Sequence, residues 1–225
     1  MSNEIRVVRV TNQEELDAAL EATPSDDVVI QIDSDPGKYV PIYIFVTDSH
    51  GHAVEACGES RVIVAGKARL TARERSRVEA HDDAWVYATD SSRVIWHDSS
   101  TGKCGCYARG QAWDRAAVEM HALCPFCAFD SAEVTARGVS RVVAQDEASV
   151  KAYDQSVVEM SDDADVTAYG QSVVYCTGGE VYAHEHATVY VMEDADRPSV
   201  DGVPTVVVHD FNGDTPVAGG AVVIA

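Results

Sequence analysis

Apolar residues recur at every eighth position along most of this chain. From Val54 to Val174, sixteen such positions hold twelve valines, and the only occupants that are not apolar are Gly102 and Gly110. If the valine is position 0 of an octad, alanine usually stands at +2, serine or alanine at −2, and aspartate or glycine at +4. One residue is lost after Val174, and the phase resumes at Val181.

This octad predicts short β-strands. Small or apolar residues at −2, 0 and +2 alternate with polar ones, which is the period of a strand, whereas a helix needs apolar residues three and four apart. Aspartate and glycine suit the corners between strands, because aspartate bonds nearby backbone N–H groups and glycine tolerates positive φ. Short strands at a fixed period stack into a parallel β-solenoid, in which each coil buries its inward row against the next.

The number of octads in one coil is a separate question. Serine and alanine alternate at position −2 from Ser140 to Ser172, which gives a 16-residue period. The inward residues are also small, and they suit a thin coil with two faces. We therefore expect two octads per coil, with a three-faced coil of three octads as the alternative.

The two ends of the chain differ from the octads. Residues 1–53 predict a small α/β cap, with strands at 4–10 and 28–33 and a helix between them. Thr11 and Glu14 have the spacing of a capping box at the start of that helix, and Pro24 ends it. The octad solenoid is expected to cover residues 54–195. Residues 196–225 contain the strand-like segments TVVVHDF and AVVIA, which are expected to cap the other end or to pair with a second subunit.

The composition narrows the classes of partner. The chain carries a formal net charge of −20, from 37 acidic and 17 basic residues. This charge disfavours direct binding to nucleic acid or to an anionic membrane and favours a protein with a basic surface. No apolar run is long enough for a transmembrane helix, and the start, MSNEIRVVRV, lacks the pattern of a signal peptide. We therefore expect a cytoplasmic protein with reduced cysteines.

Octads of the form S-x-V-x-A-x-D-x, such as SRVVAQDE and ADVTAYGQ, resemble the repeat tracts of uncharacterised proteins from actinobacteria and their phages. The resemblance covers roughly residues 54–194. It implies a β-solenoid and brings no established activity. Two better-known solenoid families do not fit, because calcium-binding nonapeptide repeats need paired glycines and hexapeptide acyltransferases need a period of six. Calcium along the aspartate row is kept as an alternative.

Four of the six cysteines lie where the valine pattern weakens. Cys104 and Cys106 are spaced C-x-C, and Cys124 and Cys127 are spaced C-x-x-C. Two close thiolate pairs match the ligands of one structural zinc, which would add stability where two core valines are missing. The first alternative is packing, because Cys104 and Cys124 fall on inward rows, as Cys176 does. The second is a redox pair, although CPFC lacks the strand and helix that surround a thioredoxin-like site.

Other candidate chemistry is sparse. In a two-faced coil His81 and His97 would be stacked neighbours, either as a metal pair or as ordinary solvated side chains. The tyrosine, tryptophan and phenylalanine residues are expected on outward positions, apart from Phe126 in the valine row. No Ser–His–Asp set or phosphate-binding loop is recognisable, and short corners leave no room for the loops that wall the clefts of solenoid lyases and glycosidases. We therefore expect no enzyme activity and keep a solenoid carbohydrate-active enzyme as an alternative.

The charge is unevenly distributed. Residues 54–115 carry 9 acidic and 10 basic groups, whereas residues 116–195 carry 14 and 3, a net charge of −11. At two octads per coil the second segment spans about five coils, or about 24 Å. Its charge density of about one per 2 Å approaches the value of duplex DNA, about one per 1.7 Å. We expect a non-catalytic interaction or scaffold protein, dimeric through its tail. The alternatives are a phage-derived DNA mimic that inhibits a DNA-binding or host-defence protein, and acidity that serves only solubility.

Overall fold

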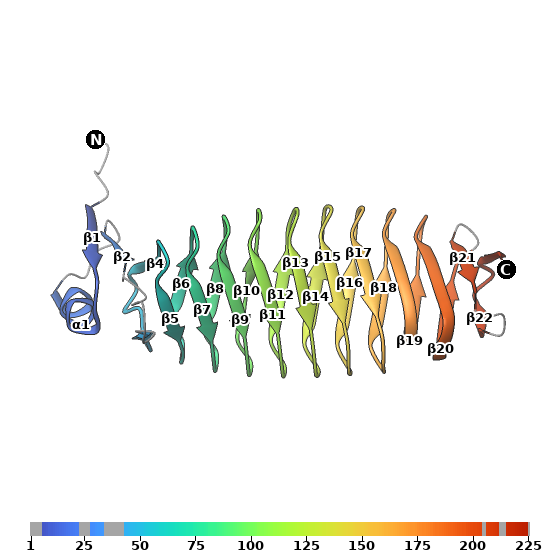
Figure 1. Ribbon diagram of the computed structural model, residues 1–225, viewed down its shortest axis with the longest axis horizontal. Helices are drawn as coiled ribbons and strands as arrows, with labels where there is room; N and C mark the ends of the chain where they lie inside the picture. The colour runs from blue at the N-terminus through green and yellow to red at the C-terminus, as the bar shows by residue number, and fades with distance from the viewer. Residues whose placement is uncertain (1–5, 23–27, 34–42, 204–205, 212–214, 225) are drawn as a thin grey trace. The chain divides into compact units, whose positions relative to one another are not determined.

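The computed structural model describes residues 6–22, 28–33, 43–203, 206–211 and 215–224. It contains two compact units, Met1–Gly110 and Gln111–Ala225, which we name the amino-terminal and the carboxy-terminal unit. Short parallel strands make up nearly all of each unit, as Figure 1 shows. The predicted all-β fold, a parallel β-solenoid with a small α/β piece at its amino-terminal end, is confirmed.

Each octad from β4 to β18 forms one short strand. The amino-terminal unit contains β1 (Arg6–Val10), α1 (Gln13–Ala22), β2 (Val28–Ile32), β3 (Tyr43–Val46), β4 (Ala53–Ala56), β5 (Arg61–Val64), β6 (Arg69–Ala72), β7 (Arg77–Ala80), β8 (Trp85–Ala88), β9 (Arg93–Trp96) and β10 (Thr101–Cys104). The boundary between the units lies within β11 (Arg109–Ala112). The carboxy-terminal unit contains β12 (Ala117–Met120), β13 (Pro125–Ala128), β14 (Glu133–Ala136), β15 (Arg141–Ala144), β16 (Ser149–Ala152), β17 (Val157–Met160), β18 (Asp165–Ala168), β19 (Val173–Ala183), β20 (Thr188–Gly202), β21 (Val207–Asp210), β22 (Val217–Ala218) and β23 (Val222–Ile224).

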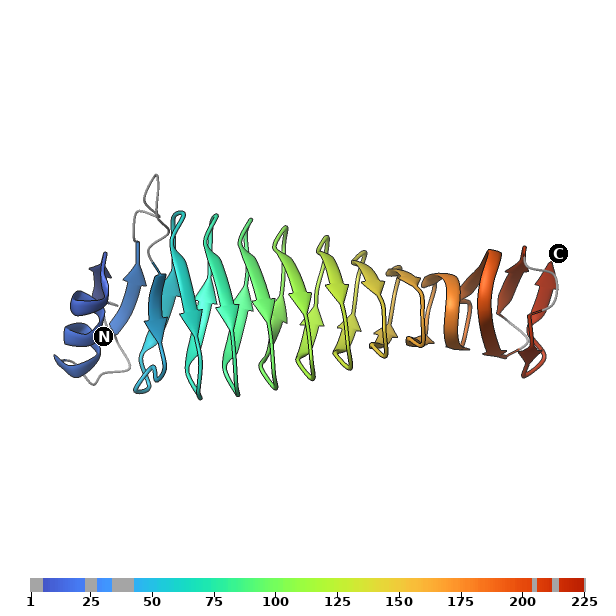
Figure 2. The ribbon, with the colours of Figure 1, turned by 60° about the horizontal axis from the view of Figure 1, so that its bottom comes forward.

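The strand register fixes the size of the coil. The octad strands of each unit up to β17 pair with the second strand along the chain, so that Val62 of β5 lies opposite Val78 of β7. In the carboxy-terminal unit Val134 of β14 lies opposite Val118 on one side and Val150 on the other. These partners are two octads apart, and in each unit successive strands alternate between two stacks (Figure 2). The prediction of two octads per coil is therefore confirmed, and the three-octad alternative is wrong.

The core lies between the two stacks and consists of the predicted inward rows. The valines at position 0, the alanines at +2 and the small residues at −2 are buried, as Val150, Ala152 and Ala148 illustrate with no exposed surface. Because one coil holds two octads, serines that are two octads apart share one side of the coil. Two of them, Ser76 and Ser92, donate their hydroxyls at 2.7 Å to backbone carbonyls of their own corners.

One aromatic residue departs from the predicted outward position. Trp96 occupies position +2 of its octad, where alanine is usual, and it is completely buried. A Cβ atom built on Gly102 would lie 2.7 Å from the indole nitrogen of Trp96 and 2.1 Å from the backbone oxygen of Val86. The tryptophan therefore fills the space that the missing side chain leaves, and the expectation that tryptophans face outward was wrong at this position.

The corners are tight turns with a residue in the left-handed region at position +4. At one of them the Ala84 N–H donates to the His81 carbonyl at 3.1 Å, and Asp82 between them has a φ of 56°. Aspartate and glycine tolerate this conformation better than most residues do. This requirement explains why aspartate or glycine dominates position +4.

The corner carboxylates also link neighbouring coils. The Asp82 carboxylate accepts the Gly66 N–H at 3.1 Å, and the Asp98 carboxylate accepts the Asp82 N–H at 3.2 Å. The sequence analysis expected these side chains to bond backbone groups nearby in sequence. The structure corrects this expectation, because the donor lies two octads earlier, in the preceding coil.

The lost residue after Val174 removes one corner. Strand β19 runs through both faces without a turn, and the pairing offset becomes one position shorter, with Asp165 opposite Glu180 and Val173 opposite Thr188. Gly179, with a φ of 79°, lies within this strand. The predicted change of phase is thus accommodated by straightening the chain at one corner.

At the amino-terminal end, β1 pairs in parallel with β2, and β2 pairs with the first octad strand, β4. The helix cap differs from the prediction by one residue. The Glu15 N–H donates to Asn12 at 3.0 Å, and the Glu15 carboxylate accepts the Thr11 N–H at 2.7 Å, so Asn12 and Glu15 take the roles expected of Thr11 and Glu14. The bond from the Thr11 N–H, followed by one from the Thr11 hydroxyl, lowers the pKa of the Glu15 carboxyl. Pro24 lies outside the described residues.

Residues beyond the octads continue the parallel stack. Strand β20 pairs with β21 and with β22, and β21 pairs with β23. The apolar side chains of β23 are about half exposed, with Val222 at 51% and Val223 at 49%. Along the described part of the chain, no helix has both the length and the apolar character needed to cross a membrane.

Candidate functional site

The structure places the two cysteine pairs in different units. In the amino-terminal unit, Cys104 ends β10 with its side chain buried, whereas Cys106 lies exposed in the following corner with a φ of 58°. The two thiols of this C-x-C pair therefore face opposite sides of the coil wall.

The second cysteine pair is divided in the same way. Cys124 is buried and donates its thiol to the His121 carbonyl at 3.1 Å, whereas Cys127 points outward from β13 and is half-buried. Burial raises the pKa of the Cys127 thiol, which is the opposite of the shift that makes a redox cysteine reactive. Among the described residues, no group of three or more histidine, cysteine, aspartate or glutamate side chains is arranged to hold a metal ion. One zinc on Cys104, Cys106, Cys124 and Cys127 stays a prediction.

The expected stack of His81 and His97 is present. Their ring centroids lie 4.9 Å apart with planes 6° from parallel, and the Asp98 carboxylate lies 3.4 Å from His81 Nδ1. The lone pair of an imidazole nitrogen lies in the plane of its ring, so the lone pairs of two stacked parallel rings lie in parallel planes. A metal would need both nitrogens to converge at about 2.0–2.1 Å. In this arrangement the rings stack, and their nitrogens do not converge on one point.

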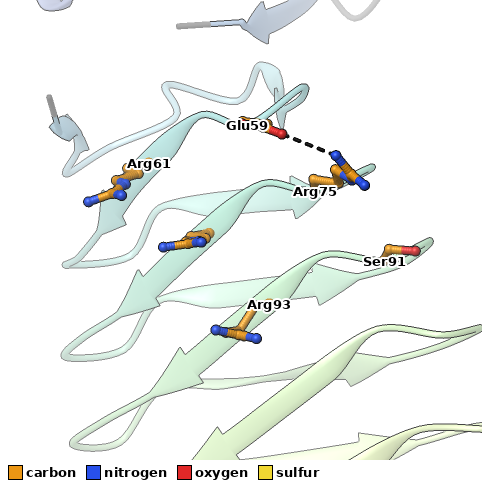
Figure 3. A pocket seen from close by; sticks show the side chains of 6 residues that line it. Glu59, Arg61, Arg75, Ser91 and Arg93 are labelled. Carbon is orange, nitrogen blue, oxygen red and sulfur yellow. Dashed lines mark hydrogen bonds and ion pairs between the residues drawn. The ribbon is translucent and has the colours of Figure 1, made fainter. Parts of the chain in front are cut away.

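Arginines form an outward row on the amino-terminal unit. Arg61, Arg77 and Arg93 begin β5, β7 and β9 and lie opposite one another in register. Together with Glu59, Arg75 and Ser91 they line a hollow of about 310 Å³ (Figure 3). Arg75 is bonded to Glu59 at 3.2 Å, whereas Arg61, Arg77 and Arg93 form no ion pair within the described parts of the chain. The sequence analysis found this segment less acidic but did not recognise the row, although the regular spacing of the three arginines was visible.

The carboxy-terminal unit presents an acidic corner row. It consists of Asp114, Asp130, Asp146 and Asp162, all exposed. Each carboxylate after the first accepts the backbone N–H of the preceding aspartate, at 3.3 Å, 3.3 Å and 3.5 Å. These bonds hold the aspartates in a line with one carboxylate per coil.

The basic residues between 116 and 195 lie outside the acidic corner row. Arg137 is bonded to Glu119 at 3.3 Å, and Arg141 is bonded to Glu159. These arginines are two of the three basic residues between 116 and 195. Most of the basic charge in the segment is therefore engaged away from the acidic corner row.

A second acidic region lies where the corner is lost. Asp165 and Glu180 are register partners, and they line an open hollow of about 1100 Å³ with Asp162 and Asp163. Burial, followed by the Glu180 carboxylate, raises the pKa of Asp165. Tyr182 donates its hydroxyl to Glu180 at 2.6 Å. Both carboxylates project from neighbouring strands of one stack, so they do not face each other across a cleft.

Stacked rings line one corner of the carboxy-terminal unit. The rings of Tyr153, Tyr169 and His184 follow one another at centroid distances of 4.9 Å, and the Arg137 guanidinium lies 4.6 Å from the centre of the Tyr153 ring. The ring faces cover one another. They therefore stabilise neighbouring coils and leave mainly ring edges for a ligand.

Comparison with known proteins gave no match to a family model, a curated protein or a solved structure. The candidate surfaces are therefore defined by their geometry alone. They are the acidic corner row of the carboxy-terminal unit and the arginine row of the amino-terminal unit.

Proposed function

We propose that this protein is a non-catalytic interaction scaffold whose carboxy-terminal unit binds a protein with a basic surface. The acidic corner row carries the proposal. Its four aspartates are exposed, are held in line by backbone hydrogen bonds and recur once per coil, which is about every 4.8 Å. Rows of one charge sign steer an oppositely charged partner and fix its register.

The form of the corners supports a binding role over catalysis. Catalytic sites need groups held in a cleft that excludes water. The tight turns that join the octad strands are too short to form the walls of such a cleft. A solenoid carbohydrate-active enzyme would most reasonably use Asp165 and Glu180, because glycosidases need two carboxylates. Such enzymes place the sugar between the two groups, whereas these lie side by side on adjacent strands. We expect no glycosidase or lyase activity, and hydrolysis that is lost in Glu180→Gln would contradict this expectation.

A DNA mimic is the second candidate, and the confirmed coil size favours it. With two octads per coil, the net charge of −11 between residues 116 and 195 is spread over about 24 Å of stacked strands. This density is close to that of duplex DNA, about one charge per 1.7 Å. A DNA-processing or host-defence enzyme would then be the basic partner, in keeping with the resemblance to repeat proteins of actinobacteria and their phages.

The experiment is a capture from lysate with a charge-only control. A triple variant with asparagine at Asp130, Asp146 and Asp162 removes three charges but keeps a side-chain acceptor and tolerance of positive φ. Asparagine at Asp82, Asp90 and Asp98 removes the same number of corner charges from the amino-terminal unit and serves as the control. Circular dichroism first establishes that both variants fold.

We expect the wild type and the control to retain a basic protein that salt releases and that the carboxy-terminal variant fails to retain. Release of that protein by duplex DNA, and its identification as a DNA-processing enzyme, would establish the mimic. Structural or envelope proteins that DNA does not displace would establish the scaffold. Equal retention by all three proteins would refute the role of the corner row.

The proposal includes a cytoplasmic location and a dimer formed through the tail. The half-exposed apolar strand β23 supports the dimer, because Val222, Val223 and Ile224 present a strand edge that a second copy could extend. Val223→Asp should shift the sedimentation coefficient from dimer to monomer. A protein that is monomeric at high concentration before the substitution would refute the dimer.

A further inference from the structure

The arginine row of the amino-terminal unit has an arrangement that folding alone does not require. Arg61, Arg77 and Arg93 stand on three successive strands of one stack, so their backbones repeat about every 4.8 Å. Like charges placed directly opposite one another on adjacent strands destabilise a sheet. Arg109 continues the row, because its N–H donates to Ser92 as the Arg93 N–H donates to Ser76 in the coil before.

Elsewhere in the chain, an arginine at a comparable position is neutralised. Arg141 also begins an octad strand, and it is bonded to Glu159. That glutamate stands two positions beyond Val157, which is the register partner of Arg141 in the next coil. At the corresponding diagonal position Arg77 has Ile95, which has no charge. At the same diagonal position Arg61 has Glu79, yet neither Arg61 nor Arg77 forms an ion pair in the described parts of the chain.

The hollow beside the row has the chemistry of an anion site. Its volume is about 310 Å³, and its lining combines the guanidinium groups of the row with the Ser91 side chain. Figure 3 shows Arg61 and Arg93 extending from the outer face of their strands, with Ser91 at the adjoining corner. The carboxylate in the lining, Glu59, is bonded to Arg75.

We propose that Arg61, Arg77 and Arg93 bind a linear polyphosphate, in which the phosphate groups are linked directly to one another and carry no bases. Guanidinium groups bind phosphate oxygens through two parallel hydrogen bonds, which makes arginine the preferred residue for such anions. Three guanidiniums in a line at a fixed spacing match an extended chain of phosphates better than a single one. This site is independent of the acidic corner row, so either proposal can fail without the other.

The test measures binding of inorganic tripolyphosphate by isothermal titration calorimetry at low salt, with orthophosphate and a single-stranded oligonucleotide as comparison probes. Arg77→Ala removes the central guanidinium from an exposed position, and Arg77→Lys keeps its charge but loses the planar pair of donors. Arg141→Ala removes an arginine that already has an ion-pair partner and is the matched control.

We expect saturable binding of about one tripolyphosphate per amino-terminal unit, weaker binding of orthophosphate and affinity that falls as salt rises. Arg77→Ala should weaken binding at least about tenfold, which is the loss expected from one charge-assisted contact. Arg77→Lys should give an intermediate loss, and Arg141→Ala should bind as the wild type does.

Three results would overturn the proposal. The first is no saturable binding of tripolyphosphate, or equal binding by the wild type and Arg77→Ala. The second is tighter binding of the oligonucleotide, which would make the row a nucleic-acid contact. The third is salt-sensitive self-association that Arg77→Ala abolishes, which would make a second copy of the chain the occupant of the row.

Discussion

Substitution of Val150 by aspartate tests the inward valine row most directly. Val150 lies in the middle of β16, is completely buried, and is stacked between Val134 and Val166 of the neighbouring coils. Losing the buried valine costs about 1.5–3 kcal/mol. Enclosing an unpaired carboxylate costs several kcal/mol more. The sum is about 5 kcal/mol or more, which approaches the whole stability of a typical domain, about 5–15 kcal/mol.

The loss of stability should depend on pH in a defined direction. Burial raises the pKa of the new carboxyl above its value in the unfolded chain, about 3.9. The unfolded state therefore releases this proton more readily, and the destabilisation grows as the pH rises from the unfolded pKa toward the folded one. It should shrink as the pH falls toward the unfolded value, because the carboxyl then stays protonated in both states.

Urea unfolding followed by far-ultraviolet circular dichroism measures the effect at pH 7 and pH 4.5. Lys151→Asp is the control, because it places the same carboxylate one residue later, exposed on the outer face and between Thr135 and Thr167. We expect this control to change stability by no more than about 1 kcal/mol. If Val150→Asp were as stable as the wild type at pH 7, the inward assignment of the valine row would be refuted.

Three further predictions follow from single contacts, and a fourth follows from the spacing of the cysteines. Asp82→Ala should cost about 1–2 kcal/mol in urea unfolding, because it removes the hydrogen bond to the preceding coil and places an alanine at a φ of 56°. Asp82→Asn should cost little, because asparagine keeps an acceptor and tolerates this φ; equal losses would contradict both roles. Gly102→Ala should cost at least about 1–3 kcal/mol by the same assay, because its Cβ would lie 2.1 Å from the Val86 backbone oxygen and 2.7 Å from the Trp96 indole nitrogen. An unchanged midpoint would contradict this close packing. Asp165→Asn should raise the melting temperature at pH 7, because the raised pKa of Asp165 means that its charged form destabilises the fold at pH values above the usual pKa of an aspartate. This gain in melting temperature should vanish below about pH 4, where the carboxyl is protonated in both the folded and the unfolded state. A gain that persists at that low pH would refute the electrostatic cause. Elemental analysis of protein purified without added metal should find about one zinc per chain, lost with thermal stability in Cys124→Ser; metal-free, fully stable protein would leave the cysteines as packing.

The sequence alone determined the repeat architecture of this protein. In a solenoid each residue packs mainly against the same position of the next coil, so a period along the chain is also a period in space. The valine spacing therefore defined the strand and its inward rows. The alternation of serine and alanine from Ser140 to Ser172 defined the coil of two octads, and the missing residue after Val174 located the lost corner.

Contacts that break the repeat needed the tertiary structure. Trp96 and Gly102 compensate each other although they belong to consecutive strands with different partners, so no period links them. The corner carboxylate of Asp82 accepts a hydrogen bond from the preceding coil, because the corners of successive coils stack in space. The sequence showed only that aspartate favours turns, so it did not identify this donor. The helix cap moved from Thr11 to Asn12, since neighbouring polar residues both satisfy the sequence pattern and only the backbone path selects one.

The candidate surfaces show the same division. The excess of acid in residues 116–195 was visible from composition, but its arrangement as an exposed row depended on the stacking of the corners, which places one aspartate of the row in each coil. The arginine row required the register, because a surface hollow forms only when side chains from β5, β7 and β9 are brought side by side. The period determines which residues can be neighbours, and three-dimensional packing decides which of those neighbours leave a charge without a partner.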